Sequence, residues 1–370
     1  MTSLARRPGW RRAAIRAALR TVLIACLLSL FLPAGTSRML PPAVERSRPR
    51  SPAASEAPPL LELRIGLDVD ADGWVVLPEW SGVWVAGGGT LSEIDQDSGE
   101  VRRTGTGRWD YDHVQLAGYG EGAILLASGS VLWALDASSG SVVRRNDLEH
   151  VGFVDAVINT RSGTWVAASG NDDGVLARID LDTGAASGRV RIGHGRHQIV
   201  TSAGYLVVGS QDPTRPGIVR VDQRTGAKLT LREGTGSIAS VGYRVWVATG
   251  EDVRCISVLD GTSCGAVPVP GAVSVASEGA RLWVLSATGS TSPSTYQPDP
   301  DRPATVTLVD GVNGEIAGGP LALPSITPAT ISAFDGRAWI GFHDGGRVIR
   351  IDCGAGRCSV PGWGALDQST

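Results

Sequence analysis

Residues 82–89 read GVWVAGGG and residues 92–101 read SEIDQDSGEV, and this pair of phrases decides the fold. Both phrases return six more times, for example as AILLASGS with WALDASSGSV and as YLVVGS with VRVDQRTGAK. The large apolar position of the first phrase falls at Trp84, Leu125, Trp165, Leu206, Trp246, Trp283 and Trp339, so the spacings are 41, 40, 41, 40, 37 and 56 residues. A repeat of this length indicates an array of similar supersecondary units.

The second phrase predicts a hairpin turn. It carries an aspartate in every repeat, at Asp95, Asp136, Asp180, Asp222, Asp260, Asp310 and Asp352. A glycine follows four residues later in six repeats, and Cys264 takes that place in the fifth. An aspartate can bind backbone amides two residues on, and glycine supplies the positive φ that closes such a loop. We therefore expect these aspartates to be turn residues rather than catalytic acids, and the repeated tryptophan to pack between units.

The fold class that follows is all-β. Short β-branched runs separated by turns, without an amphipathic helical stretch, are typical of strands. Seven units of about 43 residues have the size of four-stranded propeller blades. The sequence predicts a seven-bladed β-propeller over residues 61–363, followed by a tail over residues 364–370. In each blade strand a comes first, strand b carries the repeated apolar position, strand c ends at the aspartate and strand d follows the turn.

Two segments compete to close the ring. LLELRIGL (60–67) resembles a strand d placed before the first strand a, and CSVPGW (358–363) could occupy the same outer position of the last blade. The long sixth interval comes from the polar, proline-rich residues 288–303, which we expect to form a surface loop between strands b and c.

The N-terminus predicts an extracytoplasmic protein. Six arginines precede the apolar run of 12 residues at 21–32, which is shorter than a membrane span and suits a signal peptide. An uncleaved signal anchor, with the arginines inside, is the alternative for residues 1–32. Residues 33–60 contain seven prolines and read as a disordered linker. We expect contact with a membrane only through the N-terminal segment.

Charge excludes one class of partner. Residues 1–60 carry ten arginines and two acids, a net +8, whereas the remainder carries 24 basic and 35 acidic residues, a net −11. Nucleic-acid binding needs clustered cations, so the body of the protein is not expected to bind nucleic acid.

One acidic segment matches a calcium loop. Residues 68–79 follow the pattern D-x-D-x-D-G-x5-E, with Asp68, Asp70, Asp72 and Glu79 as candidate ligands. Carboxylates in this arrangement can surround a hard cation, and Gly73 permits the sharp turn. The flanking segments are strands rather than helices, so an acidic turn without a metal is the alternative.

Four cysteines lie in the repeat region. Cys255 and Cys264 flank the c–d turn of the fifth unit, and Cys353 and Cys358 flank the same turn of the seventh. Each pair faces across one hairpin, which predicts two disulfides and an oxidising compartment. A zinc site built from all four is the competing interpretation. A G-x-S-x-G match at 261–265 falls in the first of these turns and lacks the strand–turn–helix context of a nucleophile elbow.

The five histidines map to one rim. His113, His150, His194 and His197 fall in d–a connections, and His343 falls in a b–c connection, which shares that rim. Asp110, Asp112, Glu149 and Asp155 lie near the same segments. Neutral imidazoles and carboxylates can bind a divalent metal, or a histidine can act as a base. His194 and His197 are the candidate catalytic residues of this reading, and unconnected polar loop residues are the alternative.

The alternation VWVA…RID…TG over residues 61–363 resembles bacterial extracytoplasmic propellers of the virginiamycin B lyase-like and quinoprotein-like groups. ALDASSG (134–140) resembles the repeat of pyrroloquinoline quinone enzymes, although Arg144 or Arg145 replaces the tryptophan that closes their motif. Streptogramin lyases open a lactone with a metal and a histidine base, and only the clustered histidines point that way here.

Two functions are therefore expected. The first is a non-catalytic binding or scaffold module that meets a protein or glycan partner at the propeller rim, with calcium as the one cofactor that the sequence suggests. The second is a metal-dependent lyase or hydrolase, similar to streptogramin lyase, with its site on the histidine-bearing rim.

Overall fold

The computed structural model describes residues 61–70, 75–79, 82–87, 89–106, 114–118, 123–170, 173–212, 217–232, 236–287, 303–324, 328–342 and 347–353. In this part of the chain every regular element is a strand. No helix among these residues has the length and apolar character needed to cross a membrane. The segments predicted to be a signal or anchor, a linker and a tail lie outside the described residues.

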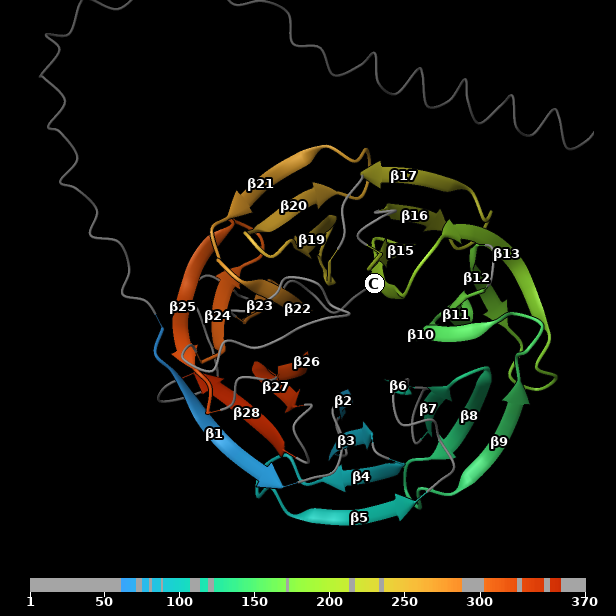
Figure 1. Ribbon diagram of the computed structural model, residues 1–370, viewed down its shortest axis with the longest axis horizontal. Coiled ribbons are helices and arrows are strands. Elements are labelled where there is room, and N and C mark those ends of the chain that lie inside the picture. Colours follow the sequence, from blue (N-terminus) through green and yellow to red (C-terminus); the bar gives the residue numbers. More distant parts are fainter. Residues whose placement is uncertain are drawn as a thin grey trace, which may run out of the picture. The chain divides into compact units, whose positions relative to one another are not determined.

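The strands form seven four-stranded antiparallel sheets arranged as blades around one axis (Figure 1). The first three blades contain β2 (Val75–Glu79), β3 (Gly82–Gly87), β4 (Thr90–Ile94) and β5 (Val101–Thr106); β6 (Val114–Gly118), β7 (Ala123–Ser128), β8 (Val131–Asp136) and β9 (Val142–Asp147); and β10 (Phe153–Thr160), β11 (Gly163–Ser169), β12 (Gly174–Ile179) and β13 (Ala186–Gly193).

The next three blades follow the same order from the centre outward. They contain β14 (His197–Ser202), β15 (Tyr205–Ser210), β16 (Ile218–Asp222) and β17 (Lys228–Arg232); β18 (Ile238–Val241), β19 (Arg244–Ala248), β20 (Val253–Ser257) and β21 (Ser263–Val267); and β22 (Ala272–Glu278), β23 (Arg281–Ser286), β24 (Thr305–Asp310) and β25 (Glu315–Ala322). The predicted seven-bladed all-β propeller is confirmed.

The seventh blade combines both ends of the ring. It holds β26 (Pro328–Phe334), β27 (Arg337–Phe342) and β28 (Arg347–Cys353), and its outer strand is β1 (Leu63–Asp70), so its order is β26-β27-β28-β1. β1 runs antiparallel to β28, from Leu63 opposite Cys353 to Asp70 opposite Arg347. Residues 63–67 of the predicted 60–67 segment therefore belong to the outer strand, and residues 358–363 lie outside the described residues.

The repeated apolar run forms strand b, which is buried on both faces. Every residue of β3 is buried, which explains why its sequence is continuously apolar instead of alternating. Trp84 packs with Val114, Ile124 and Leu126 of the second blade, and Trp339 packs with Val76, Val83 and Val85 of the first. The tryptophans thus fill the seams between neighbouring blades, as predicted.

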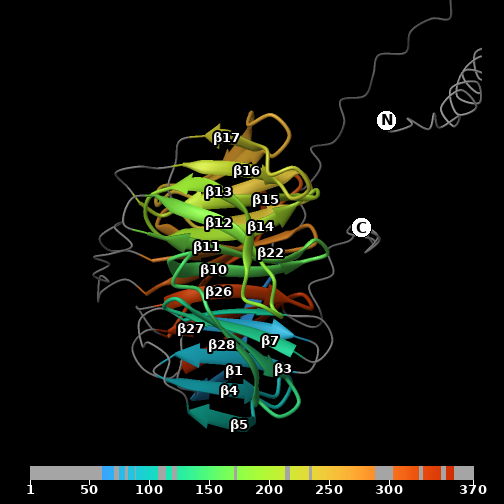
Figure 2. The ribbon, with the colours of Figure 1, turned by 90° about the vertical axis from the view of Figure 1, so that its right-hand side faces the viewer.

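The order of strands gives the ring two distinct sides. Because strands a to d alternate in direction, the a–b and c–d turns lie on one side, and the b–c and d–a connections lie on the other. We call the first side the turn face and the second the histidine-bearing rim. Figure 2 shows the ring edge-on, with β17 and β5 at opposite ends.

Candidate functional site

Among the described residues of the histidine-bearing rim, His194 and Asp173 form an accessible histidine–aspartate pair. His194 follows β13, and its Nε2 lies 3.2 Å from Oδ1 of Asp173, the residue before β12. The two side chains are 32% and 39% exposed, so solvent and small ligands can reach them. Arg191 lies at the edge of the pair, 4.0 Å from Asp173. This geometry leaves the His194 imidazole within reach of a ligand.

His197 occupies a different environment from His194. It is the first residue of β14, its side chain is fully buried, and its Nδ1 lies 2.9 Å from Oδ2 of Asp155 on β10. Asp155 also accepts a hydrogen bond from the Ser169 hydroxyl at 3.0 Å. Nε2 of His197 has no hydrogen-bond partner among the described residues, and a Cβ at Gly174 would lie only 2.9 Å from it. His197 therefore ties the third blade to the fourth, out of reach of a substrate in this arrangement.

Of the other histidines and acidic residues predicted on this rim, the structure describes only some. His150 and Glu149 are exposed in the connection that follows β9. His113, His343, Asp110 and Asp112 lie outside the described residues. Within the described ranges, no three histidine, cysteine or acidic side chains gather closely enough to hold a metal ion. His194 and His197 are thus near in sequence, but only His194 is accessible to solvent. The catalytic assignment stays a prediction, and it depends on His194.

Three of the four candidate calcium ligands lie on two strands, Asp68 and Asp70 on β1 and Glu79 on β2. Asp68 lies on β1, where its carboxylate forms a two-fold ion pair with the Arg347 guanidinium of β28. This contact lowers the pKa of Asp68. Glu79 ends β2, about 13 Å from Val75 at a normal strand rise. Asp72 and the Asp70 side chain lie outside the described residues, and calcium binding stays a prediction.

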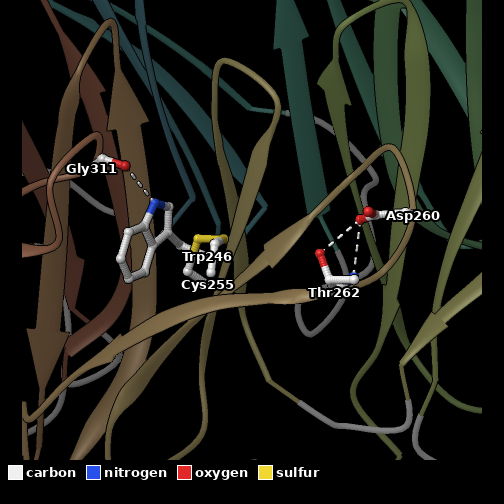
Figure 3. The surroundings of a disulfide bond; sticks show 6 residues. Trp246, Cys255, Asp260, Thr262 and Gly311 are labelled. Atoms are coloured by element: carbon white, nitrogen blue, oxygen red, sulfur yellow. Dashed lines mark hydrogen bonds between the residues drawn. A yellow bond between two sulfur atoms is a disulfide. The ribbon is translucent and has the colours of Figure 1, made fainter.

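The fifth-blade cysteines form a disulfide (Figure 3). Cys255 on β20 and Cys264 on β21 have Cα atoms 5.0 Å apart, and the bond crosses the c–d hairpin. This disulfide removes two of the four thiolates that the alternative zinc site required, so that site is wrong for this arrangement. Cys353 ends β28 and is buried, whereas Cys358 lies outside the described residues. The second pairing stays a prediction.

The repeated aspartates act as turn residues in the six turns that the structure describes. Each accepts a hydrogen bond from a backbone amide two or three residues further on: Asp95, Asp136, Asp180, Asp222, Asp260 and Asp310. The amides of Ser98 and Asp97 lower the pKa of Asp95 to about 2. Hydrogen bonds also lower the pKa values of Asp136, Asp180, Asp222 and Asp260. The five carboxyl groups whose pKa is lowered are ionised near neutral pH, so they do not serve as proton donors there.

A second set of contacts, which the sequence analysis did not predict, joins the fourth blade to the fifth and the seventh blade to the first. Arg220 on β16 donates from Nη1 to the carbonyl oxygens of Val258 at 2.9 Å and Leu259 at 2.7 Å, in the c–d turn of the following blade. Arg350 on β28 donates to the carbonyl of Gln96 in the same way. Both arginines stand two residues before the turn aspartate. An arginine two residues before the turn aspartate, as in VRVD and IRID, is the sequence signal that could have predicted these contacts.

Three exposed apolar side chains lie on adjoining turns of the fifth and sixth blades, and we call them the apolar cluster of the turn face. Tyr243 in the β18–β19 turn is 61% exposed, Leu259 in the β20–β21 turn is 52% exposed, and Val312 after β24 is 38% exposed. The amide of Val258 donates to the carbonyl of Tyr243 at 2.9 Å, which holds the first two turns together. Trp246 Nε1 donates to the Gly311 carbonyl at 3.0 Å, which joins them to the third (Figure 3).

Fold and contacts together define a seven-bladed β-propeller. It is similar to solved propellers: the BamB protein of Moraxella catarrhalis, at 13% identity and a TM-score of 0.52, and the Cps50 (Swd1) β-propeller domain of Myceliophteria thermophila, at 13% identity and a TM-score of 0.58. Each match covers 78% of this chain and 99% of the other. At this identity the likeness shows the fold alone. No family model matches the sequence, and no curated protein matches it.

Proposed function

We propose that the protein is a non-catalytic binding module, held outside the cytoplasm by its N-terminal segment, whose propeller meets a protein or glycan partner. The observation that carries this proposal is the apolar cluster of Tyr243, Leu259 and Val312 on the turn face. Apolar side chains that gather at the surface of a water-soluble domain mark interaction sites, and tyrosine is enriched at the centres of interfaces.

The contacts beneath the cluster support the same proposal. Arg220 lies 4.4 Å from the centre of the Tyr205 ring while it binds the Val258 and Leu259 carbonyls. The disulfide crosses the hairpin whose turn carries Leu259. A partner would therefore meet turns that are already fixed, which lowers the entropic cost of association. The disulfide also agrees with an oxidising compartment.

Two surfaces compete as the contact site. The first is residues 288–303, a predicted surface loop of the histidine-bearing rim, which lies outside the described residues apart from Pro303. The apolar cluster lies on the opposite side of the ring, and we place the contact there. The following experiment would also detect a partner that binds at the histidine-bearing rim instead.

The test is site-specific photo-cross-linking in cells that make the protein. A benzophenone amino acid replaces Tyr243 in one variant, Leu259 in a second and Glu149 of the histidine-bearing rim in a third, and a matched control carries it at Val143, an exposed apolar residue of outer strand β9. We expect one defined adduct from Tyr243 and Leu259, lost when the other residue is changed to serine, and none from Val143. Equal adducts at all four positions, or adducts from Glu149 alone, would contradict the proposal.

The alternative is a metal-dependent lyase or hydrolase, which the resemblance to streptogramin lyases suggests. The accessible His194–Asp173 pair is the observation that favours it. Metal-dependent turnover of a substrate that is lost in His194→Ala but persists in His150→Ala, on the same rim, would favour the enzyme over the binding module.

A further inference from the structure

A cavity lies at the inner edge of the first three blades. Its volume is about 520 Å³, within the range of small-molecule sites. The lining residues come from the inner strands β2, β6 and β10: Leu77, Glu79, Leu116, Ala117, Gly118, Val157, Ile158 and Asn159. Glu79 and Gly118 are the last residues of their strands, and Asn159 is the last but one of its strand, so the cavity lies toward the turn face.

Glu79 is the charged group of this cavity. It is half-buried and makes no hydrogen bond or ion pair with the described residues. A Cβ at Gly118 would lie 2.0 Å from Oε1 of Glu79, so the carboxylate rests directly on the backbone of β6. Burial raises the pKa of Glu79. The side chain thus holds a charge that its surroundings solvate poorly.

In the sixth blade the glutamate at the equivalent position has hydrogen-bond and ion-pair partners. Glu278 ends β22 as Glu79 ends β2, and its carboxylate accepts the Gly336 amide at 2.6 Å and lies 3.6 Å from Nη1 of Arg281. Arg281 faces Glu278 across the strand pair, and Gly82 stands at the matching position opposite Glu79. Among the described residues, the first blade has the acid but no cation at the position opposite it.

The inner strands are also joined differently here. Around the rest of the ring, a side-chain hydrogen bond ties each inner strand, or the turn after it, to the next: His197–Asp155, Gln198–Ile238, Ser277–Ser240, Glu278–Gly336 and Ser332–Val76. Within the described residues no such bond ties β2 to β6 or β6 to β10. The cavity lies between the strands that lack these bonds.

We propose that this cavity binds an organic cation, an ammonium or guanidinium group on an apolar stem, with the Glu79 carboxylate as its counter-charge. Leu77, Leu116 and Ile158 offer the stem an apolar wall. The Asn159 amide oxygen already accepts the Thr164 hydroxyl at 3.3 Å and has a second lone pair for the cation. One carboxylate and one amide supply too few oxygens for calcium, which takes six to eight. The net charge of −11 over residues 61–370 adds a general attraction for cations.

The cation has two sources with the same chemistry. It is either a free small amine or the arginine or lysine side chain of a protein that docks on the turn face. The inference does not require the proposed partner, because the cavity can take a free cation without one.

The experiment is isothermal titration of the full chain with n-butylamine, n-butylguanidine and the peptide acetyl-Gly-Arg-Gly-amide, with n-butanol as the neutral analogue. We expect the cations to bind and butanol not to bind. Because a charge-assisted hydrogen bond is lost, Glu79→Gln should weaken binding by about tenfold or more. Glu278→Gln, the matched acid with internal partners, should leave the affinity unchanged. Peptide binding much tighter than that of butylguanidine would identify a protein side chain as the source, and equal binding would identify a free amine.

A second variant guards against an effect on folding. Gly118→Ala keeps every charge but places a methyl group where the Glu79 carboxylate lies, so it should abolish binding while the thermal midpoint shows a folded ring. Affinity should also fall as pH decreases through the raised pKa of Glu79, since only the ionised carboxyl binds a cation. Butanol binding as well as butylamine, unchanged affinity in Glu79→Gln, or no binding of any cation at millimolar concentration would overturn the proposal.

Discussion

At the scale of single residues, the turn aspartates link the stability of the ring to pH. Their folded-state pKa values lie below the ordinary value of 3.8, and that of Asp95 is about 2. A carboxyl with a lowered folded pKa contributes stability that is present above its unfolded pKa and is lost as pH falls through its folded pKa. We therefore expect the free energy of unfolding to decline between about pH 4.5 and pH 2, measured by urea denaturation at a series of pH values.

One variant separates this linkage from general acid effects. Asp95→Asn keeps a side-chain oxygen for the Asp97 and Ser98 amides but cannot titrate. Its stability should depend less steeply on pH below 4 than that of the wild type. An identical slope would show that Asp95 does not contribute to the linkage.

The buried tryptophans offer a matched pair at the same scale. Trp246 Nε1 donates to the Gly311 carbonyl, whereas Trp283 Nε1 is buried without a partner among the described residues. Replacement by phenylalanine removes similar volume from both seams, but only Trp246→Phe also leaves a buried carbonyl unpaired. We expect Trp246→Phe to cost about 1–2 kcal/mol more than Trp283→Phe in chemical denaturation. Equal losses would mean that the Gly311 contact adds no net stability.

At the scale of elements, the disulfide stabilises the β20–β21 hairpin. The two cysteines are 9 residues apart, and closing a loop of this size in the unfolded chain corresponds to roughly 2–3 kcal/mol. Cys264 is exposed, and an exposed side chain ordinarily tolerates substitution within about 0.5 kcal/mol. A loss of about 2–3 kcal/mol in Cys264→Ser would therefore report the bond itself. A neutral effect would show that the cysteine is unpaired in the protein tested.

The same scale shows what a single sequence can predict. Each hairpin was readable because its signals are local: an apolar run, an aspartate and a glycine within ten residues. The sequence did not decide which segment forms the outer strand of the seventh blade. β1 pairs with a segment some 280 residues away, as the Asp68–Arg347 contact shows, and the sequence pattern of a strand does not identify the strand that it pairs with. In the calcium pattern of residues 68–79, Asp68 lies on β1 and Glu79 ends β2 at the inner cavity, while residues 71–74 between the two strands lie outside the described residues, so calcium binding stays a prediction. His194 and His197 were predicted as one pair, yet His197 is buried at the start of β14 and His194, three residues earlier, is partly exposed.

At the scale of the whole molecule, the turn face, the inner cavity and the blade-to-blade contacts all depend on one closed ring. Closure rests on β1, which pairs with β28 along its length and whose Leu63 and Val69 are buried. Just before it, the Leu61 amide donates to the Ala317 carbonyl of the sixth blade at 2.8 Å. Strands that complete a buried core open only with the whole domain, whereas a loosely attached edge strand opens by itself.

Native-state hydrogen exchange of β1, followed residue by residue, tests this closure most directly. We expect the hydrogen-bonded amides of residues 63–70 to be protected as strongly as those of β28 and to exchange only when the whole ring unfolds. Rapid exchange of β1 beside a protected β28 would contradict the closed ring, because the seventh blade would then lack its outer strand.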